Sequence, residues 1–408
     1  MKLFSLFISD SIFISTVHNK IIRITTSPLA LRYLLPGQMR FMQENGFDVI
    51  MISADGKERD EVIKNEECPH IMVPMTRKIT PWRDLQCLWQ LIKIFKKEKP
   101  DIVHSHTPKA GLLGMVAAYV CSVKVRIHTV AGLPLMAEKG YRFRLLTLIE
   151  KITYVSANHV WPNSNSLKKY IIENKLTKIS KLGIISRGSS NGIDLNRFNK
   201  RSLDKDILEE IKMDICYSEK NQYLLFVGRM VADKGITELV QAFSIVQKNQ
   251  PALQLLLIGP FENELDPLPG DTLKEIEMNP GILHINWTDR VEYYMSLAGY
   301  FVFPSHREGF PNVLLQAGAM ELPIICSSIP GNIDIVTAGE TGITFEKQNV
   351  EDLMDAIIHA IKDPGASQKM ANKLMKIVSG NYDREMIWGA LLNKYHELLL
   401  TQKVESYH

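Results

Sequence analysis

The feature that most constrains the fold is an alternation of short apolar segments and longer amphipathic segments, which begins near Lys20 and occurs twice along the chain. Strands that alternate with helices at this spacing form parallel sheets covered by helices on both faces, so the pattern predicts an α/β fold. In the first half the expected strands are 21–26, 48–53, 70–75, 101–106, 125–130, 159–163 and 182–186, and the expected helices include 34–45, 81–97, 110–121, 142–156 and 166–173.

The alternation is interrupted by a Gly-, Ser- and Asn-rich segment at residues 187–201, which is typical of a linker. It then starts again, with expected strands at 223–227, 253–258, 282–286, 300–303, 324–327 and 342–345 and helices at 237–248, 291–298, 312–320, 350–362 and 364–378. We therefore predict two doubly wound Rossmann-like domains that face each other across a cleft. The expected boundaries are an N-terminal extension at 1–19, a first domain at 20–198, a second domain at 199–383 and, at 384–408, a C-terminal helix that crosses back to the first domain.

Positive charge follows the first predicted strand of the second domain. That strand ends at Gly228, Arg229 follows it, and Lys234 comes shortly after. Two cations beside a glycine are typical of a diphosphate site. The glycine lets the backbone approach the ligand closely, and Arg and Lys form charge-assisted bonds with phosphate oxygens. The alternative is a pair of solvent-facing side chains in a loop. Gly259 ends the next strand and is expected to border the base of a nucleotide.

A second anion site is predicted within residues 301–323, which read as a buried strand, a tight turn and a helix start. Pro311 suits the first turn of a helix, where its missing N–H costs nothing. The free N–H groups at that helix start favour an anion. Glu308 precedes this helix end and Gln316 lies on the helix, so both are expected to flank a bound ligand.

Charge is unevenly distributed along the chain. Residues 1–200 hold 30 Lys and Arg against 16 Asp and Glu, whereas residues 201–408 hold 18 against 29. A basic half favours a phosphorylated substrate or an anionic membrane surface, and ordinary surface variation is the alternative. The amphipathic segment 85–99 carries its basic residues late, which suits either a packed surface helix or contact with anionic lipid. We expect no nucleic-acid partner.

The five cysteines are scattered without metal or redox spacing, so we expect reduced thiols in the cytoplasm and no metal site. No apolar segment reaches the ~18 residues needed to span a bilayer. The apolar segment at residues 3–17 contains Asp10 and several serines, and we interpret it as an extension that precedes the first strand. A surface anchor is the alternative.

Two segments in the second half resemble a known family. GRMVADKG (residues 228–235) and PSHREGFPNVLLQAGAMELP (304–323) have the order and distance of the donor site in family 4 glycosyltransferases, which are retaining enzymes of the GT-B fold. GIDLNRF (192–198) and DIVHSHTPKAG (101–111) also resemble the family, and the resemblance extends from about Lys20 to Tyr395. The first half is most similar to enzymes that build bacterial capsule, exopolysaccharide or glycan repeat units.

The resemblance implies roles for particular residues. Arg229 and Lys234 match the residues that bind the nucleotide diphosphate, Glu308 matches the carboxylate that contacts the donor sugar, and His128 matches a histidine near that sugar. The residues expected to place backbone at the sugar and phosphate are Gly309, Phe310 and Asn312. Gln316 departs from the family, because a carboxylate there usually holds the ribose. Its amide oxygen still accepts a hydrogen bond, without the strength of a charge.

The resemblance implies a hexosyl- or N-acetylhexosaminyltransferase that moves a sugar, without a metal, from a UDP-linked donor to a lipid-diphosphate-linked glycan acceptor. No cofactor is expected, because the nucleotide sugar is a substrate. Ser27 and Lys109 follow strand ends of the first domain and His106 ends a buried strand, and all three are expected to bind the acceptor; a core or hydrogen-bonded histidine is the alternative for His106. The expected location is cytoplasmic, at the inner face of the cytoplasmic membrane.

Two alternatives remain open from the sequence: a nucleotide-sugar epimerase of the same fold, and a non-catalytic glycosyltransferase-like subunit. An epimerase would use the same diphosphate site without an acceptor. A nicotinamide-dependent dehydrogenase is disfavoured, because no GxGxxG motif follows the first strand.

Overall fold

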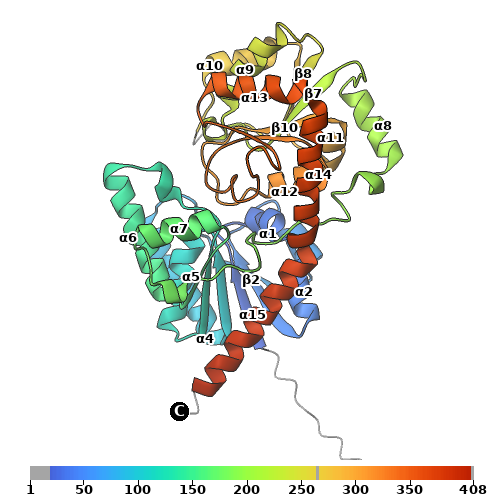
Figure 1. Cartoon of the computed structure of the whole chain (residues 1–408). Helices are drawn as coiled ribbons and strands as arrows, with labels where there is room; N and C mark the ends of the chain where they lie inside the picture. The colour runs from blue at the N-terminus through green and yellow to red at the C-terminus, as the bar shows by residue number, and fades with distance from the viewer. Residues whose placement is uncertain (1–18, 263–265, 406–408) are drawn as a thin grey trace, which may run out of the picture.

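The computed structural model describes residues 19–262 and 266–405, so the expected N-terminal extension lies almost wholly outside the described residues. Two α/β domains lie one above the other, and the last helix runs from the second domain down the side of the first (Figure 1). Both sheets are parallel, as the alternation of strands and helices predicts. Within the described residues, no helix is long and apolar enough to cross a membrane.

The first domain is built on a six-stranded sheet with the order β3-β2-β1-β4-β5-β6. Its strands are β1 (Asn19–Ile24), β2 (Phe47–Ser53), β3 (His70–Met72), β4 (Ile102–His106), β5 (Val125–Val130) and β6 (His159–Pro162). Its helices are α1 (Pro28–Leu34), α2 (Gln38–Glu44), α3 (Arg59–Glu66), α4 (Pro81–Glu98), α5 (Pro108–Val120), α6 (Gly140–Ser156) and α7 (Asn165–Glu173), with 3-10 turns η1 (Pro134–Ala137) and η2 (Ile179–Lys181).

The second domain repeats this plan with the strand order β12-β11-β10-β7-β8-β9. Its strands are β7 (Gln222–Val227), β8 (Leu253–Ile258), β9 (Ile282–Ile285), β10 (Tyr300–Phe303), β11 (Ile324–Ser327) and β12 (Ile343–Phe345). Its helices are α8 (Lys205–Asp214), α9 (Ile236–Gln247), α10 (Gly270–Met278), α11 (Val291–Leu297), α12 (Asn312–Ala319), α13 (Val350–Lys362) and α14 (Pro364–Asn381), with 3-10 turns η3 (Lys200–Ser202) and η4 (Ala232–Lys234).

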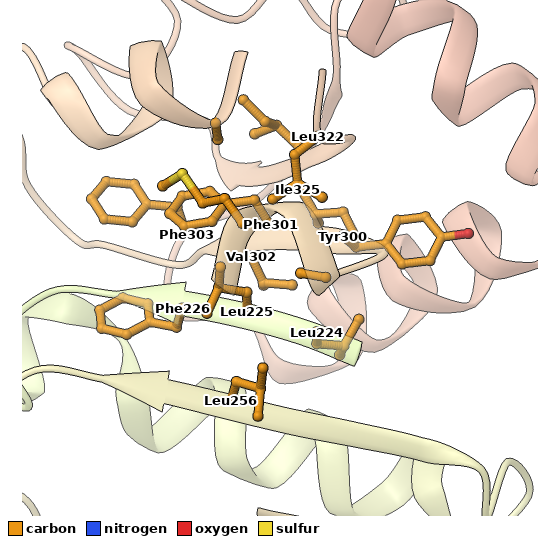
Figure 2. Packing of buried hydrophobic residues seen from close by; sticks show 14 of the residues in the cluster. Leu224, Leu225, Phe226, Leu256, Tyr300, Phe301, Val302, Phe303, Leu322 and Ile325 are labelled. Carbon is orange, nitrogen blue, oxygen red and sulfur yellow. The ribbon is translucent and has the colours of Figure 1, made fainter. Parts of the chain in front are cut away.

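Both faces of each sheet are buried, which explains why the strands read as nearly continuous apolar runs. In β1 the neighbours Ile21 and Ile22 pack into different core clusters, one with α2 and the other with α4 and α5. In the second sheet, Phe226 of β7 and Phe303 of β10 stack with ring centroids 6.0 Å apart (Figure 2). Because the strands themselves are buried, the polar residues that follow them lie at one edge of each sheet.

The structure corrects two expected elements. Residues 182–186 do not form a strand: Leu182 makes an isolated bridge with Val160, and Ser186 has a φ of 50°, which turns the chain away. The helix expected at 34–45 is α2, which begins only at Gln38, because Pro36 and Gly37, whose φ is 79°, separate it from α1, a helix that was not expected. The charged helices α3, α8 and α10 were not expected.

The chain passes between the domains twice, and the two crossings lie side by side. The Ile193 N–H donates to the Tyr382 carbonyl at 2.7 Å, and the Arg384 N–H donates to the Ile193 carbonyl at 3.0 Å. Gly192 permits this approach, since its φ is 65° and a Cβ there would lie 2.7 Å from the Tyr382 oxygen. The segments around Ile193 and Asp383 therefore form one paired hinge.

Helix α15 (Arg384–Glu405) packs against the first domain, and its Leu391, Tyr395 and Leu398 enter the core cluster that contains α2. The polar centre of this contact is Arg23, whose side chain is 1% exposed. Its guanidinium donates to the Tyr395 hydroxyl and to Gln38, and lies 2.9 Å from His104 Nδ1. Burial lowers the pKa of Arg23, whereas Tyr395 and the charge of Glu66 favour its protonated form.

Tyr395→Phe is expected to destabilise the protein by about 1–3 kcal/mol, because it removes a buried acceptor of a charged donor and leaves the ring in place. Urea unfolding of both forms measures the difference. Tyr141→Phe is the matched control, since Tyr141 is 78% exposed and the loss of its hydroxyl should not change the free energy of unfolding. Equal stability of the Tyr395 variant and the parent would contradict the role assigned to this cluster.

Candidate active site

The two domains enclose a cavity of ≈ 280 Å³ between their strand ends. It is lined by both halves of the chain, and it brings together His128 of the first domain with Arg229, Lys234, Glu308 and Gly309 of the second. This is the edge at which parallel α/β sheets bind ligands. The cavity therefore collects the residues that were predicted from separate segments of the sequence.

Lys234 and Glu308 form an ion pair in this cavity, with side chains 16% and 13% exposed. The Ser305 hydroxyl also donates to Glu308 Oε1 at 2.8 Å, which fixes the orientation of the carboxylate. Gly235 allows the pair to form: a Cβ there would lie 2.1 Å from the Pro304 carbonyl oxygen, so only glycine lets η4 approach the end of β10.

Arg229 follows β7 and its side chain is 51% exposed. It forms an ion pair with Glu262, whose carboxylate also lies 3.7 Å from Arg77 of the first domain. The backbone beneath it is close-packed, since Gly259 has a φ of 142° and a Cβ on it would lie 1.8 Å from the Gly228 oxygen. Arg229 is thus held at the mouth of the cavity, where it can meet an anion.

His128 lies within β5, two residues before its end, and is 3% exposed. Its Nδ1 lies 2.9 Å from the Ser105 hydroxyl, and Gly111 makes room for the ring, because a Cβ there would lie 2.4 Å from His128 Cε1. Burial lowers the pKa of His128 to about 4. The imidazole is therefore neutral at pH 7, and it can offer a hydrogen bond without carrying charge.

The domains approach each other most tightly at Gly309. A Cβ on this residue would lie 1.7 Å from the Ala131 carbonyl oxygen and 2.9 Å from Gly132 Cα, both in the first domain. The backbone after Glu308 is therefore in direct contact with the loop after β5. Any side chain at position 309 would hold the two walls of the cavity apart.

Glu150 of α6 also lines the cavity, and sequence reasoning did not identify it. It lies in an apolar run, TLIEKITYV, where its side chain is 5% exposed. Burial raises the pKa of Glu150 to about 7. A lone carboxyl on the buried side of a helix was the signal that could have indicated it.

Gln316 and Asn312 lie elsewhere. They line a separate cavity of ≈ 450 Å³ on the hinge side, together with Arg32, Arg197 and Asp289. Asn312 Oδ1 accepts from the Ser189 hydroxyl at 3.3 Å, and the Phe310 ring packs on Tyr382 with centroids 5.7 Å apart. The structure therefore does not bring Gln316 into the cavity that Glu308 lines.

The residues expected to bind an acceptor are also outside the ≈ 280 Å³ cavity. Ser27 precedes α1 and its carbonyl accepts from the Thr25 hydroxyl. His106 is 3% exposed and stacks on His104, with ring centroids 4.4 Å apart. Lys109 forms an ion pair with Asp84 at 2.6 Å. In this structure all three take part in internal packing, and their role towards an acceptor stays a prediction.

Comparison with known proteins agrees with this geometry. The family model described as Glycosyltransferase Family 4 matches residues 38–197, and the one described as Glycosyl transferases group 1 matches residues 209–376. The capsular polysaccharide biosynthesis glycosyltransferase CapM of Staphylococcus aureus is 38% identical over 367 residues, which cover 90% of this chain and 94% of CapM. The chain therefore belongs to the family 4 glycosyltransferases and is a glycosyltransferase, as the resemblance implied.

Two further proteins are similar at lower identity. The UDP-Gal:alpha-D-GlcNAc-diphosphoundecaprenol alpha-1,3-galactosyltransferase of Escherichia coli is 24% identical over 347 residues, covering 84% of this chain and 87% of its own. The crystal structure of HepE of Anabaena, in complex with UDP and glucose, has a TM-score of 0.76 at 15% identity and covers 93% of this chain and 100% of HepE. HepE shows that the fold is the GT-B arrangement of two parallel-sheet domains.

Gly309→Ala is expected to open the cleft, because the new methyl group cannot share space with the Ala131 oxygen. Small-angle X-ray scattering should show a larger radius of gyration, and sugar transfer should fall roughly 100-fold, as for a 1 Å misplacement of reacting groups. Gly380→Ala is the control, since a Cβ there meets nothing within 4 Å. Unchanged scattering and activity at position 309 would show that the tight approach is not required.

Glu150→Gln tests the buried carboxyl through pH. The pKa of Glu150 is raised in the folded state, so the unfolded chain loses its proton first, and the carboxyl costs stability as pH rises from about 4.5 to 7. The free energy of unfolding of the variant should exceed that of the parent by about 3 kcal/mol above pH 7, and the two should not differ below pH 4. Urea unfolding at several pH values measures this, with Glu173→Gln as an exposed control. A difference independent of pH would contradict the assignment.

Proposed function

We propose that this glycosyltransferase moves a hexosyl or N-acetylhexosaminyl unit, with retention, from a UDP-linked sugar to a lipid-diphosphate-linked glycan in cell-surface polysaccharide synthesis. The observation that carries the proposal is the group of Arg229, Lys234 and Glu308 at one cavity between the domains. The names of the S. aureus and E. coli relatives support capsule synthesis and a diphosphate-linked lipid acceptor. UDP occurs in the E. coli name and in the HepE complex.

The donor diphosphate would lie between Arg229 and Lys234. Both cations would stabilise the negative charge that develops on the diphosphate as the bond to the sugar breaks. Lys234 would exchange its partner from Glu308 to the phosphate, which frees the Glu308 carboxylate to accept a hydroxyl of the donor sugar. Because these two side chains supply positive charge, we propose that transfer needs neither a metal ion nor a cofactor. Within the described residues, no group of three or more His, Cys, Asp and Glu is arranged to hold a metal.

The transfer step would take place on one face of the sugar. The anomeric carbon loses its bond to the phosphate oxygen and gains one to the acceptor hydroxyl oxygen, and the hydroxyl proton passes to the leaving phosphate. His128, neutral at pH 7, would position a hydroxyl of the donor sugar by a hydrogen bond rather than act on the proton. The ribose would extend into the separate ≈ 450 Å³ cavity on the hinge side, where Gln316 would contact it through neutral hydrogen bonds, which are weaker than those of a carboxylate.

The first domain would meet the membrane through α4. Trp82 and Trp89 on this helix are 83% and 60% exposed, and its second half carries Lys93, Lys96 and Lys97. Exposed tryptophans beside lysines are typical of a helix that lies in the interface of an anionic membrane. We propose peripheral attachment at the inner face of the cytoplasmic membrane. Co-sedimentation with phosphatidylglycerol vesicles tests this attachment. The double variant Trp82→Ser/Trp89→Ser should no longer sediment with the vesicles.

The proposed reaction is tested by release of UDP from a panel of UDP-sugars in the presence of a membrane lipid extract. Arg229→Ala and Lys234→Ala should each lower the rate by about 10²–10³, the loss that follows removal of one group that stabilises the transition state. Lys373→Ala, which breaks a surface ion pair, is the control. An epimer formed from the nucleotide sugar alone would favour the epimerase alternative, and full glycan assembly with both variants would favour a non-catalytic subunit.

A further inference from the structure

A large groove of ≈ 1010 Å³ lies on the first domain, beside the ≈ 280 Å³ cavity in which the donor is proposed to bind, which is called the donor cavity below. It is formed by the loop between β3 and α4 and by the start of α6. Its walls are partly apolar and partly charged. Ile79 and Tyr141, which are 62% and 78% exposed, offer apolar surface. Three cations line the same groove: Arg77, Lys78 and Arg142. The groove therefore combines apolar contact with positive charge.

The cations of this groove are poorly neutralised. Among the residues that the structure describes, no carboxylate lies within ion-pair distance of Lys78 or Arg142, although Glu138 also lines the groove. Arg77 has one ion-pair partner within the described residues, Glu262 at 3.7 Å. A site with apolar walls and unpaired cations suits an amphiphile with an anionic head, such as the diphosphate of a polyisoprenyl lipid.

Glu262 connects this groove to the donor cavity. One oxygen of its carboxylate pairs with Arg229 and the other lies near Arg77, so a single negative charge serves two guanidinium groups on different domains. Its side chain is 24% exposed, whereas those of Arg77 and Arg229 are 56% and 51% exposed. Both cations can therefore exchange this carboxylate for a ligand that arrives from solvent.

We propose that Glu262 is the shared counter-ion of two diphosphate sites, the donor site at Arg229 and an acceptor site in the groove at Arg77. The proposal rests on the function proposed above and adds the place of the acceptor diphosphate and the residue that links the two sites. Each arriving diphosphate takes one arginine from Glu262. When UDP leaves, the carboxylate returns to Arg229, which speeds release of the product.

Binding of two soluble probes tests this by isothermal titration calorimetry: UDP for the donor site and farnesyl diphosphate for the acceptor site. Glu262→Gln should tighten both probes roughly two- to fivefold, the range that an exposed ion pair supplies. Arg77→Gln should weaken farnesyl diphosphate without tightening UDP, and Arg229→Gln should weaken UDP alone. Glu340→Gln, which removes the carboxylate of a distant surface ion pair, should change neither.

Each contrary result has a distinct meaning. Unchanged or weaker binding of either probe to Glu262→Gln would overturn the role of the shared counter-ion. Inorganic diphosphate that binds as tightly as farnesyl diphosphate would overturn the lipid site, and so would equal weakening of both probes by Arg229→Gln. If UDP binding does not depend on Arg229, the donor site itself fails, and with it the proposed function.

Discussion

A parallel sheet must bury both of its faces, and this requirement determines how the rest of the molecule is assembled. In the first domain, α4 and α5 cover one face, whereas the other is completed only when α15 returns from the far end of the chain. Tyr395 then reaches Arg23, which is buried and forms no ion pair among the residues that the structure describes. The first domain therefore depends for part of its core on residues that follow the second domain in sequence.

The active site follows from the same requirement. Since apolar residues fill the strands, polar groups collect where the strands end, and two sheets that face each other bring two such edges together. Glycines then determine how closely the backbone segments at these edges approach each other. Gly235 brings Lys234 to Glu308, and Gly309 brings the second domain against the first. The chemistry is thus carried by a few side chains whose distances are set by backbone contacts.

Much of this could be predicted from the sequence, because periodicity and motif spacing are local. The strand and helix alternation gave the two sheets, and the segments around Arg229 and Glu308 indicated the cavity. The start of the helix expected at 34–45 was wrong, because its apolar pattern was given more weight than Pro36 and Gly37, which delay the helix to Gln38. The ion pair of Lys109 with Asp84 and the bridge at Glu262 were not predictable, since each arises from residues brought together only by folding, whereas the lone carboxyl of Glu150 in an apolar helical run was a signal that was not used. The same applies to Gln316, whose helical position does not reveal which cavity it faces.

The paired hinge at Ile193 and Asp383 also limits how the molecule can move. Two hydrogen bonds hold the crossings together, and Arg384 adds an ion pair to Asp194 at 3.0 Å. Two neighbouring connections allow bending about the line between them but resist sliding and twisting. The second domain should therefore rotate about this paired hinge, and the contact at Gly309 lies close to it, because the ring of the next residue, Phe310, packs on Tyr382. A substrate at the far side of the cleft would experience the largest displacement, and one near the hinge would barely move.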